Sequence, residues 1–235
     1  MKKIFSVVIL SLFYVTGLHA AGINMGVSLS GAVFEVDGGS EEFAAGHVSN
    51  VSGSAAVSKK ASAEGDTAEG AFAVGSIFVE KVLLDRFAIG IDYVPMSMDS
   101  ETTENIQKDN TAAGSEANGT SVTNTVQVDF QDLTTIYGTV ALNENMYFKV
   151  GFMTVDVKTN ESLGTGGSYG DTSLDGMMLG LGYNRNLDNG AFLRIEANMM
   201  DLDGVTLTNT ADSDKSVKAD GIEGYGARVS IGRSF

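Results

Sequence analysis

The sequence predicts an all-β chain, folded as an eight-stranded antiparallel up-and-down transmembrane β-barrel. Large apolar residues alternate with small or polar ones along most of the eight stretches assigned as strands. This period of two is that of a strand whose two faces meet different surroundings. The connections between the stretches alternate between long and short, as an up-and-down barrel with turns at one end and loops at the other requires. Glycine is abundant, with 29 residues, and proline occurs once.

Residues 1–20 are predicted to be a secretory signal peptide, which leaves 21–235 as the barrel domain. Lys2 and Lys3 precede an apolar run over 4–15, and small residues follow up to Ala20. The apolar run is well short of the ~20 residues that a membrane-spanning helix needs. We therefore expect export with cleavage after Ala20, and membrane insertion by strands.

The eight predicted strands differ in how clearly their faces separate. The third is the clearest, because Phe87, Ile89 and Ile91 alternate with small or polar residues. In the second, both registers carry large residues, so its apolar face stays open. In the fourth, Asp132 falls on the apolar face, so we expect 122–132 to project above the membrane span or to be offset by a bulge. The strands cover 22–34, 70–80, 86–97, 133–142, 146–158, 173–185, 190–202 and 222–235.

The last strand carries the strongest family signal. Its apolar face comprises Tyr225, Ala227, Val229, Ile231 and Phe235, and glycine or serine dominates the other face. So many small residues suit the crowded interior of a narrow barrel. The chain resembles small eight-stranded bacterial outer-membrane barrels of the OmpA/OmpX-like class, whose final strand carries a C-terminal Phe that the barrel assembly machinery reads. Arg233 departs from that pattern. The resemblance implies an assembly signal at Tyr225, Val229, Ile231 and Phe235, and both termini in the periplasm.

The four long connections, 35–69, 98–121, 159–172 and 203–220, carry most of the negative charge. They hold 18 acidic and five basic residues, in a chain whose formal net charge is −15. Solvated loops account for this charge, and capture of a cation or a surface ligand is the functional alternative. Such a charge gives no electrostatic basis for binding nucleic acid.

Sites for catalysis, metals and cofactors find little support. Beyond residue 20 the chain has one histidine, His47, and it has no cysteine. A Ser-His-Asp triad or a histidine metal cluster therefore lacks its parts. The glycine-rich segment 164–170 lacks the Lys-Ser/Thr ending of a phosphate-binding loop, so we expect a turn there. We expect no enzyme activity, no metal site and no cofactor.

Charged residues on the lumen-facing register form the main candidate site. They are Arg86, Asp92, Lys149, Arg194, Glu196 and Arg228. An eight-stranded barrel is just wide enough for side chains to fill it, so these charges are expected to pair inside. We expect Glu196 to lie between Arg194 and Arg228, with Lys149 on the opposite wall and Asp92 as a second acid.

These observations favour a membrane scaffold of a Gram-negative bacterium. It would have a charge-plugged lumen and display acidic loops for adhesion or envelope integrity. The alternative is a narrow, porin-like channel for small or hydrophobic solutes. The expected partners are outer-membrane lipid and the assembly machinery, and we expect a monomer.

Overall fold

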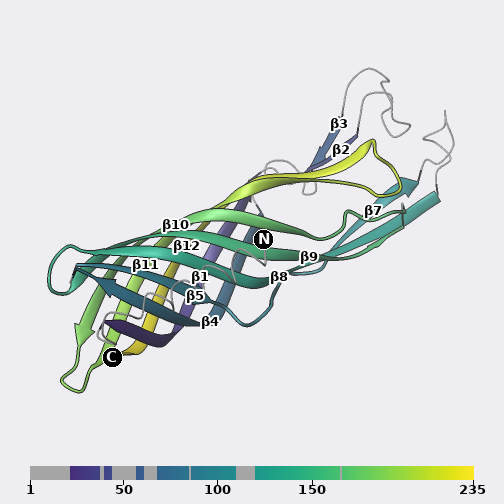
Figure 1. Ribbon diagram of the computed structural model, residues 1–235. Coiled ribbons are helices and arrows are strands. Elements are labelled where there is room, and N and C mark those ends of the chain that lie inside the picture. The colour runs from purple at the N-terminus through teal and green to yellow at the C-terminus, as the bar shows by residue number, and fades with distance from the viewer. Residues whose placement is uncertain are drawn as a thin grey trace.

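Eight strands close into an antiparallel barrel in a computed structural model that describes residues 22–37, 40–43, 57–60, 68–84, 86–109, 120–164 and 166–235 (Figure 1). Taken in their order along the chain, each of these strands pairs with the next, and the first pairs with the last to close the barrel. The predicted fold class is therefore confirmed. The strands are β1 (Ile23–Asp37), β4 (Ala68–Leu83), β5 (Phe87–Tyr93), β8 (Thr120–Ala141), β9 (Met146–Leu163), β10 (Thr172–Asn186), β11 (Ala191–Thr208) and β12 (Lys215–Ser234).

The two ends of the barrel differ. At the terminal end, the amide of Phe235 donates to the carbonyl of Ile23 at 2.8 Å, and the connections are short. At the loop end, β8, β9, β11 and β12 run past the predicted boundaries. Those boundaries were set where the apolar alternation stops, but backbone pairing continues beyond it.

Four small strands at the loop end were not predicted. They are β2 (Ser40–Phe43), β3 (Val57–Lys60), β6 (Met98–Asp99) and β7 (Thr103–Asp109). β2 pairs with the start of β12 and β3 pairs with β2, whereas β6 and β7 pair with β8. Figure 1 shows β2, β3 and β7 at this end of the molecule.

The outer face of the barrel is apolar, and the predicted lipid-facing registers are confirmed. Leu29, Ile195 and Val229 point outward with 66%, 62% and 55% of their surface exposed. Exposed apolar side chains over the whole circumference are typical of a barrel that faces lipid. The open register of the second strand is resolved as well, because Ile77 lies outside and Phe78 inside.

A row of exposed carboxylates borders this apolar face toward the loop end. Glu69, Glu35, Glu223 and Asp201 lie side by side on β4, β1, β12 and β11. We call these four residues the acidic row. Charged groups are costly within hydrocarbon, so the row marks where the lipid-facing surface ends on these strands.

A bulge in β8 explains the misplaced Asp132. Asp132 has a φ of 54°, and the β8–β9 register shifts between Gln131 and Thr134. Phe130 and Leu133 consequently both pack against the interior cluster. The bulge that the sequence suggested is confirmed, and it keeps Asp132 out of the interior.

Glycines on the inner face lie opposite aromatic rings on the neighbouring strand. The cross-strand pairs are Gly26–Phe78, Phe34–Gly224, Gly90–Tyr137, Gly182–Tyr147 and Phe192–Gly232. A Cβ at Gly90 would lie 2.6 Å from the ring of Tyr137. Each ring therefore lies over its glycine, which lets large side chains fill a narrow barrel. The described part of the chain contains no helix long and apolar enough to cross a membrane.

Candidate functional site in the barrel interior

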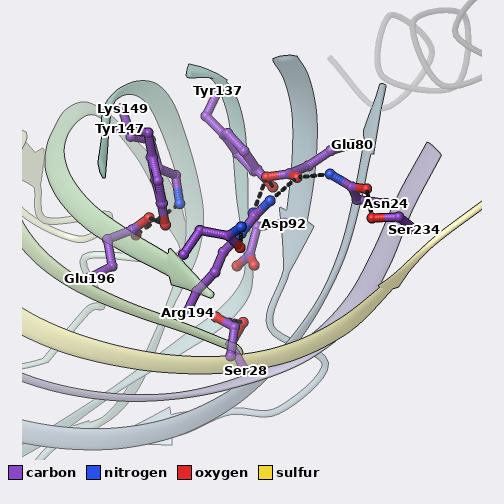
Figure 2. A network of polar contacts seen from close by, with 12 residues as sticks. Asn24, Ser28, Glu80, Asp92, Tyr137, Tyr147, Lys149, Arg194, Glu196 and Ser234 are labelled. Atoms are coloured by element: carbon purple, nitrogen blue, oxygen red, sulfur yellow. Dashed lines mark hydrogen bonds and ion pairs between the residues drawn. The ribbon is translucent and has the colours of Figure 1, made fainter. Parts of the chain in front are cut away.

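Three ion pairs cross the interior of the barrel, and Figure 2 shows much of this network from close by. Glu80 pairs with Arg194, Asp92 with Arg228, and Glu196 with Lys149. Three acids therefore balance three bases. In each pair the two residues stand on strands that are not neighbours in the sheet, so the pairs tie separate parts of the wall together. We call these six residues the ion layer.

Glu80 and Arg194 form the most complete of the three pairs. The ion pair is bidentate: Nη2 of Arg194 lies 2.7 Å from Oε2 of Glu80, and Nη1 donates a hydrogen bond to Oε1. Asn24 and Tyr137 donate to the same carboxylate at 3.1 and 3.0 Å. Glu80 is 1% exposed. A buried carboxylate with this many donors is satisfied, which offsets the cost of removing it from water.

Asp92 and Arg228 form a second bidentate pair. Nη1 and Nη2 of Arg228 lie 2.9 and 3.0 Å from the two carboxylate oxygens. Ser76 donates to Asp92, and Nε of Arg228 donates to Ser30, each at 3.0 Å. Planar guanidinium groups suit this geometry better than an ammonium group does.

Glu196 pairs with a lysine. Nζ of Lys149 lies 3.0 Å from Oε1 of Glu196, and the hydroxyl of Tyr147 donates to Oε2 at 2.8 Å. The ammonium of Lys149 also lies 4.1 Å from the ring centre of Tyr137. The ring of Tyr147 lies over Gly182, so the glycine pattern positions a hydroxyl in the ion layer.

The structure brings five of the six predicted lumen residues together. Lys149, the expected candidate on the far side, does pair with Glu196, but the two arginines that were expected to flank Glu196 pair with other acids. Glu196 contacts Lys149, while Arg194 reaches Glu80 and Arg228 reaches Asp92. Arg86 lies apart from them, exposed in the turn before β5, where it donates to the carbonyl of Ala141 at 3.5 Å. Placing Arg86 in the network was wrong, because β4 and β5 connect at that point and its side chain stays at the terminal end.

Sequence reasoning missed Glu80. Its strand had two plausible registers, so its face could not be assigned. Charge balance was the available signal: the predicted set held four bases and two acids, an imbalance that a narrow interior does not tolerate. The predicted assembly residues Tyr225, Val229, Ile231 and Phe235 all lie on the outer face, each about half exposed.

Toward the loop end of the ion layer the interior becomes apolar. Seven buried residues form its core: Met153, Val155, Val157, Leu174, Met178, Leu202 and Ile222. Beside them is a cavity of about 260 Å³, lined mainly by apolar side chains that include Phe34, Phe72 and Phe130. We call this cavity the apolar chamber.

A second cavity of about 260 Å³ lies at the terminal end and is polar. Its lining includes Arg86, Asn143 and Asn145, and it reaches Tyr147 and Arg194 of the network. It shares no lining residue with the apolar chamber. The ion layer lies between the two.

The hydrogen-bonded strand pairing of the barrel wall is interrupted beside the apolar chamber, and we call this interruption in pairing the gap. β4 pairs with β5 only over Ile77–Leu83, because β5 ends at Tyr93 and Pro95 follows. Within the described ranges, the part of β4 from Ala68 to Ser76 has no strand on its β5 side, and β6 pairs with β8 alone. Gly70 and Phe72 on one side of this gap and Met98 on the other line the chamber.

The remaining sequence features concern metal ligands, His47 and the glycine-rich segment. Among them, no group of His, Cys, Asp and Glu side chains is arranged to hold a metal ion. His47 lies outside the described ranges. In the glycine-rich segment, Gly166, Gly167 and Gly170 have positive φ angles, and β10 follows at Thr172.

No family model matches the chain, and no curated protein does. Solved structures with a similar fold include the outer membrane protein AlkL, 12% identical, with a TM-score of 0.47 over 94% of this chain and 92% of that one. OprG of Pseudomonas aeruginosa is 9% identical, with a TM-score of 0.44 over 92% and 97%. Ail, the attachment invasion locus protein of Yersinia pestis, is 11% identical, with a TM-score of 0.39 over 89% and 99%. These likenesses concern the fold alone.

Proposed function

We propose that the chain is an outer-membrane barrel that captures small apolar molecules at its loop end and exchanges them sideways with the membrane. The apolar chamber carries this proposal. Its volume of about 260 Å³ exceeds the ~150 Å³ of a dry engineered cavity that binds benzene. A pocket lined by aromatic and aliphatic side chains gains free energy by removing apolar ligand surface from water.

The paired charges of the ion layer are evidence that the lumen is closed beneath the apolar chamber. Its six charged residues are paired across the lumen, four of them buried and the two arginines largely buried, and side chains fill a barrel of eight strands. Ions that moved through it would have to break these pairs. We therefore favour a charge-plugged lumen over a porin-like channel that runs from end to end.

The gap between β4 and β6 supports a sideways route. Ala71 and Gly75 on β4 lie beside Val33 and Leu29 on β1, whose side chains are exposed on the apolar outer face. Glu69, in the acidic row, lies closer to the loop end. The part of the gap from Gly70 to Ser76 therefore lies on the lipid side of that row, and an apolar molecule that leaves the chamber there enters the membrane.

Benzene binding, followed by NMR, tests the proposed capture of apolar molecules in the chamber. We expect benzene to cause saturable shifts of the ¹³C-methyl signals of Met98 and Met153, both in the chamber wall, in protein held in lipid nanodiscs. Val155→Phe, which places a larger ring in the chamber, should abolish the saturable shift. Val150→Phe on the lipid side of the same strand is the matched control and should leave it intact. Non-saturable shifts in the wild type would overturn the proposal.

Two further experiments test the sideways route into the membrane and whether a loop of the chain itself fills the chamber. Spin-labelled lipid chains should broaden the methyl signal of Met98, beside the gap, more than that of Met178, which lies deeper; equal broadening would overturn the sideways route. Deleting 110–119 should leave benzene binding unchanged. If binding appears only after this deletion, a loop of the chain itself occupies the chamber and the capture function is wrong.

Display of acidic loops is the second candidate function. The hairpin of β7 with the start of β8, and the β2–β3 pair on β12, extend the sheet at the loop end. They give the acidic connections a structured base for a surface ligand or a cation. Removing 44–56 and 110–119 should then abolish adhesion of cells that depend on this protein while barrel assembly continues. Unchanged adhesion would argue against this role.

A further inference from the structure

Between the apolar chamber and the ion layer lies a narrower space of about 50 Å³, which Asp92 and Arg228 help to line. Five residues line both spaces, which are therefore adjacent: Phe34, Phe72, Met98, Leu133 and Met153. The surroundings change over this distance from aromatic and aliphatic side chains to polar ones.

The floor of the narrow space is polar. Asn198, Thr135, Asp92 and Arg228 contribute to its lining. Asn198 is 9% exposed, and its Oδ1 finds no hydrogen-bond donor among the described residues. A buried acceptor without a donor is costly. Oδ1 lies beside Gly180 on β10, and a ligand O–H group that reached it would supply the missing donor.

The charge of the floor is already balanced. Asp92 is matched by Arg228, Glu196 by Lys149 and Glu80 by Arg194. A carboxylate or an ammonium group added above them would be a buried charge without a counterion, which is strongly unfavourable. A neutral head group adds no such charge.

We propose that the ligand of the chamber is amphipathic, with a neutral hydroxyl head on the floor at Asn198 and an apolar body in the chamber above. This inference rests on the proposed capture function and names the class of molecule that it takes. The apolar body is held by burial of its surface, and the head group fixes its direction and depth.

The test compares 1-hexanol with its isomer methyl pentyl ether, which has the same atoms but no O–H donor, and with hexanoate. Binding is measured in nanodiscs from the saturable shifts of the methyl signals of Met153 and Met178, which line the narrow space. Asn198→Leu keeps the size of the side chain and removes the acceptor. It should lower the ratio of alcohol to ether affinity about two- to tenfold, the range that one net hydrogen bond supplies. Comparing ratios cancels differences in the hydration of the two probes.

Two other variants keep the test independent of folding defects. Thr135→Val also removes a polar group from the floor without changing its size and should lower the same ratio. Asn186→Leu, at the exposed terminal end, is the matched control and should leave it unchanged. Hexanoate should bind more weakly than 1-hexanol to the wild type.

The possible outcomes separate this inference from the function beneath it. An alcohol-to-ether ratio that is the same in the wild type, Asn198→Leu and Thr135→Val overturns the hydroxyl head but leaves capture in place. Tighter binding of hexanoate than of 1-hexanol overturns the neutral head group. Absence of saturable shifts with benzene and with all three probes overturns the capture function itself.

Discussion

Arg194 on β11 and Glu80 on β4 meet inside the barrel in a bidentate ion pair, although 114 residues separate them in the sequence. Their strands are not neighbours in the sheet, since β12 and β1 stand between them. The pair therefore forms only when the barrel has closed. Besides being part of the ion layer, the pair links two strands that are not neighbours across the lumen.

Removing Glu80 should be among the most damaging single changes. Glu80→Ala leaves Arg194 buried without its acid and takes an acceptor from Tyr137 and Asn24. We expect a loss of about 3–5 kcal/mol in the free energy of unfolding, measured from urea unfolding in lipid or detergent. Lys158→Ala, which removes one member of the exposed Lys158–Asp171 pair, is the control and should cost at most about 1 kcal/mol. Similar losses in both variants would contradict the account of the ion layer.

Replacing a glycine that lies opposite an aromatic ring should destabilise the barrel. The β-carbon of Gly182→Ala would overlap the ring of Tyr147, which then withdraws its hydroxyl from Glu196. We expect a cost of about 1–3 kcal/mol, typical of overpacking. At Gly138 the nearest atom to an added Cβ is 3.9 Å away, so Gly138→Ala should be close to neutral. Equal urea midpoints for the two variants would show that the interior accommodates the methyl group.

Much of the fold could be predicted because alternation over eight stretches fixes strands, faces and order together. The bulge at Asp132 was also predictable, since a charge on an otherwise apolar face signals a change of register. The register between strands was not, because it depends on pairing that no single strand records. For that reason Glu80 was missed, and Arg194 and Arg228 were assigned to Glu196 although they pair with Glu80 and Asp92. The gap beside β4 was beyond prediction, since it depends on how β6 and β7 pair after Pro95.

Phe235 is predicted to act in assembly more than in stability. It is 58% exposed on the outer face, so Phe235→Ala loses lipid contact while the backbone bonds to Ile23 remain possible. We expect a marked fall in the amount of inserted protein in cells, and a urea midpoint close to that of the wild type. Phe152→Ala is the matched control, because Phe152 is also 58% exposed on the outer face. An equal fall in both variants would assign the effect to lost apolar surface.

The predicted orientation places 35–69, 98–121, 159–172 and 203–220 outside the cell and both termini in the periplasm. A protease site inserted between Gly114 and Ser115 should be cut in intact cells. The same site inserted after Glu144 should be cut only after the outer membrane is opened, and serves as the control. Cleavage of the second site alone in intact cells would reverse the orientation.

The last prediction concerns closure of the lumen at Glu196. Glu196→Ala leaves Lys149 buried without its acid and opens space beside it, so we expect a lower urea midpoint and measurable single-channel conductance. Glu196→Gln should be milder, because it retains hydrogen bonds to Tyr147 and Lys149 while losing charge. The double variant Lys149→Met with Glu196→Met removes the charges together and keeps side chains of similar size. Replacing both members of a buried pair in this way is often neutral, so this barrel should stay stable and closed. A wild-type protein that already conducts strongly, or a Glu196→Ala variant as stable and closed as the wild type, would refute the plug.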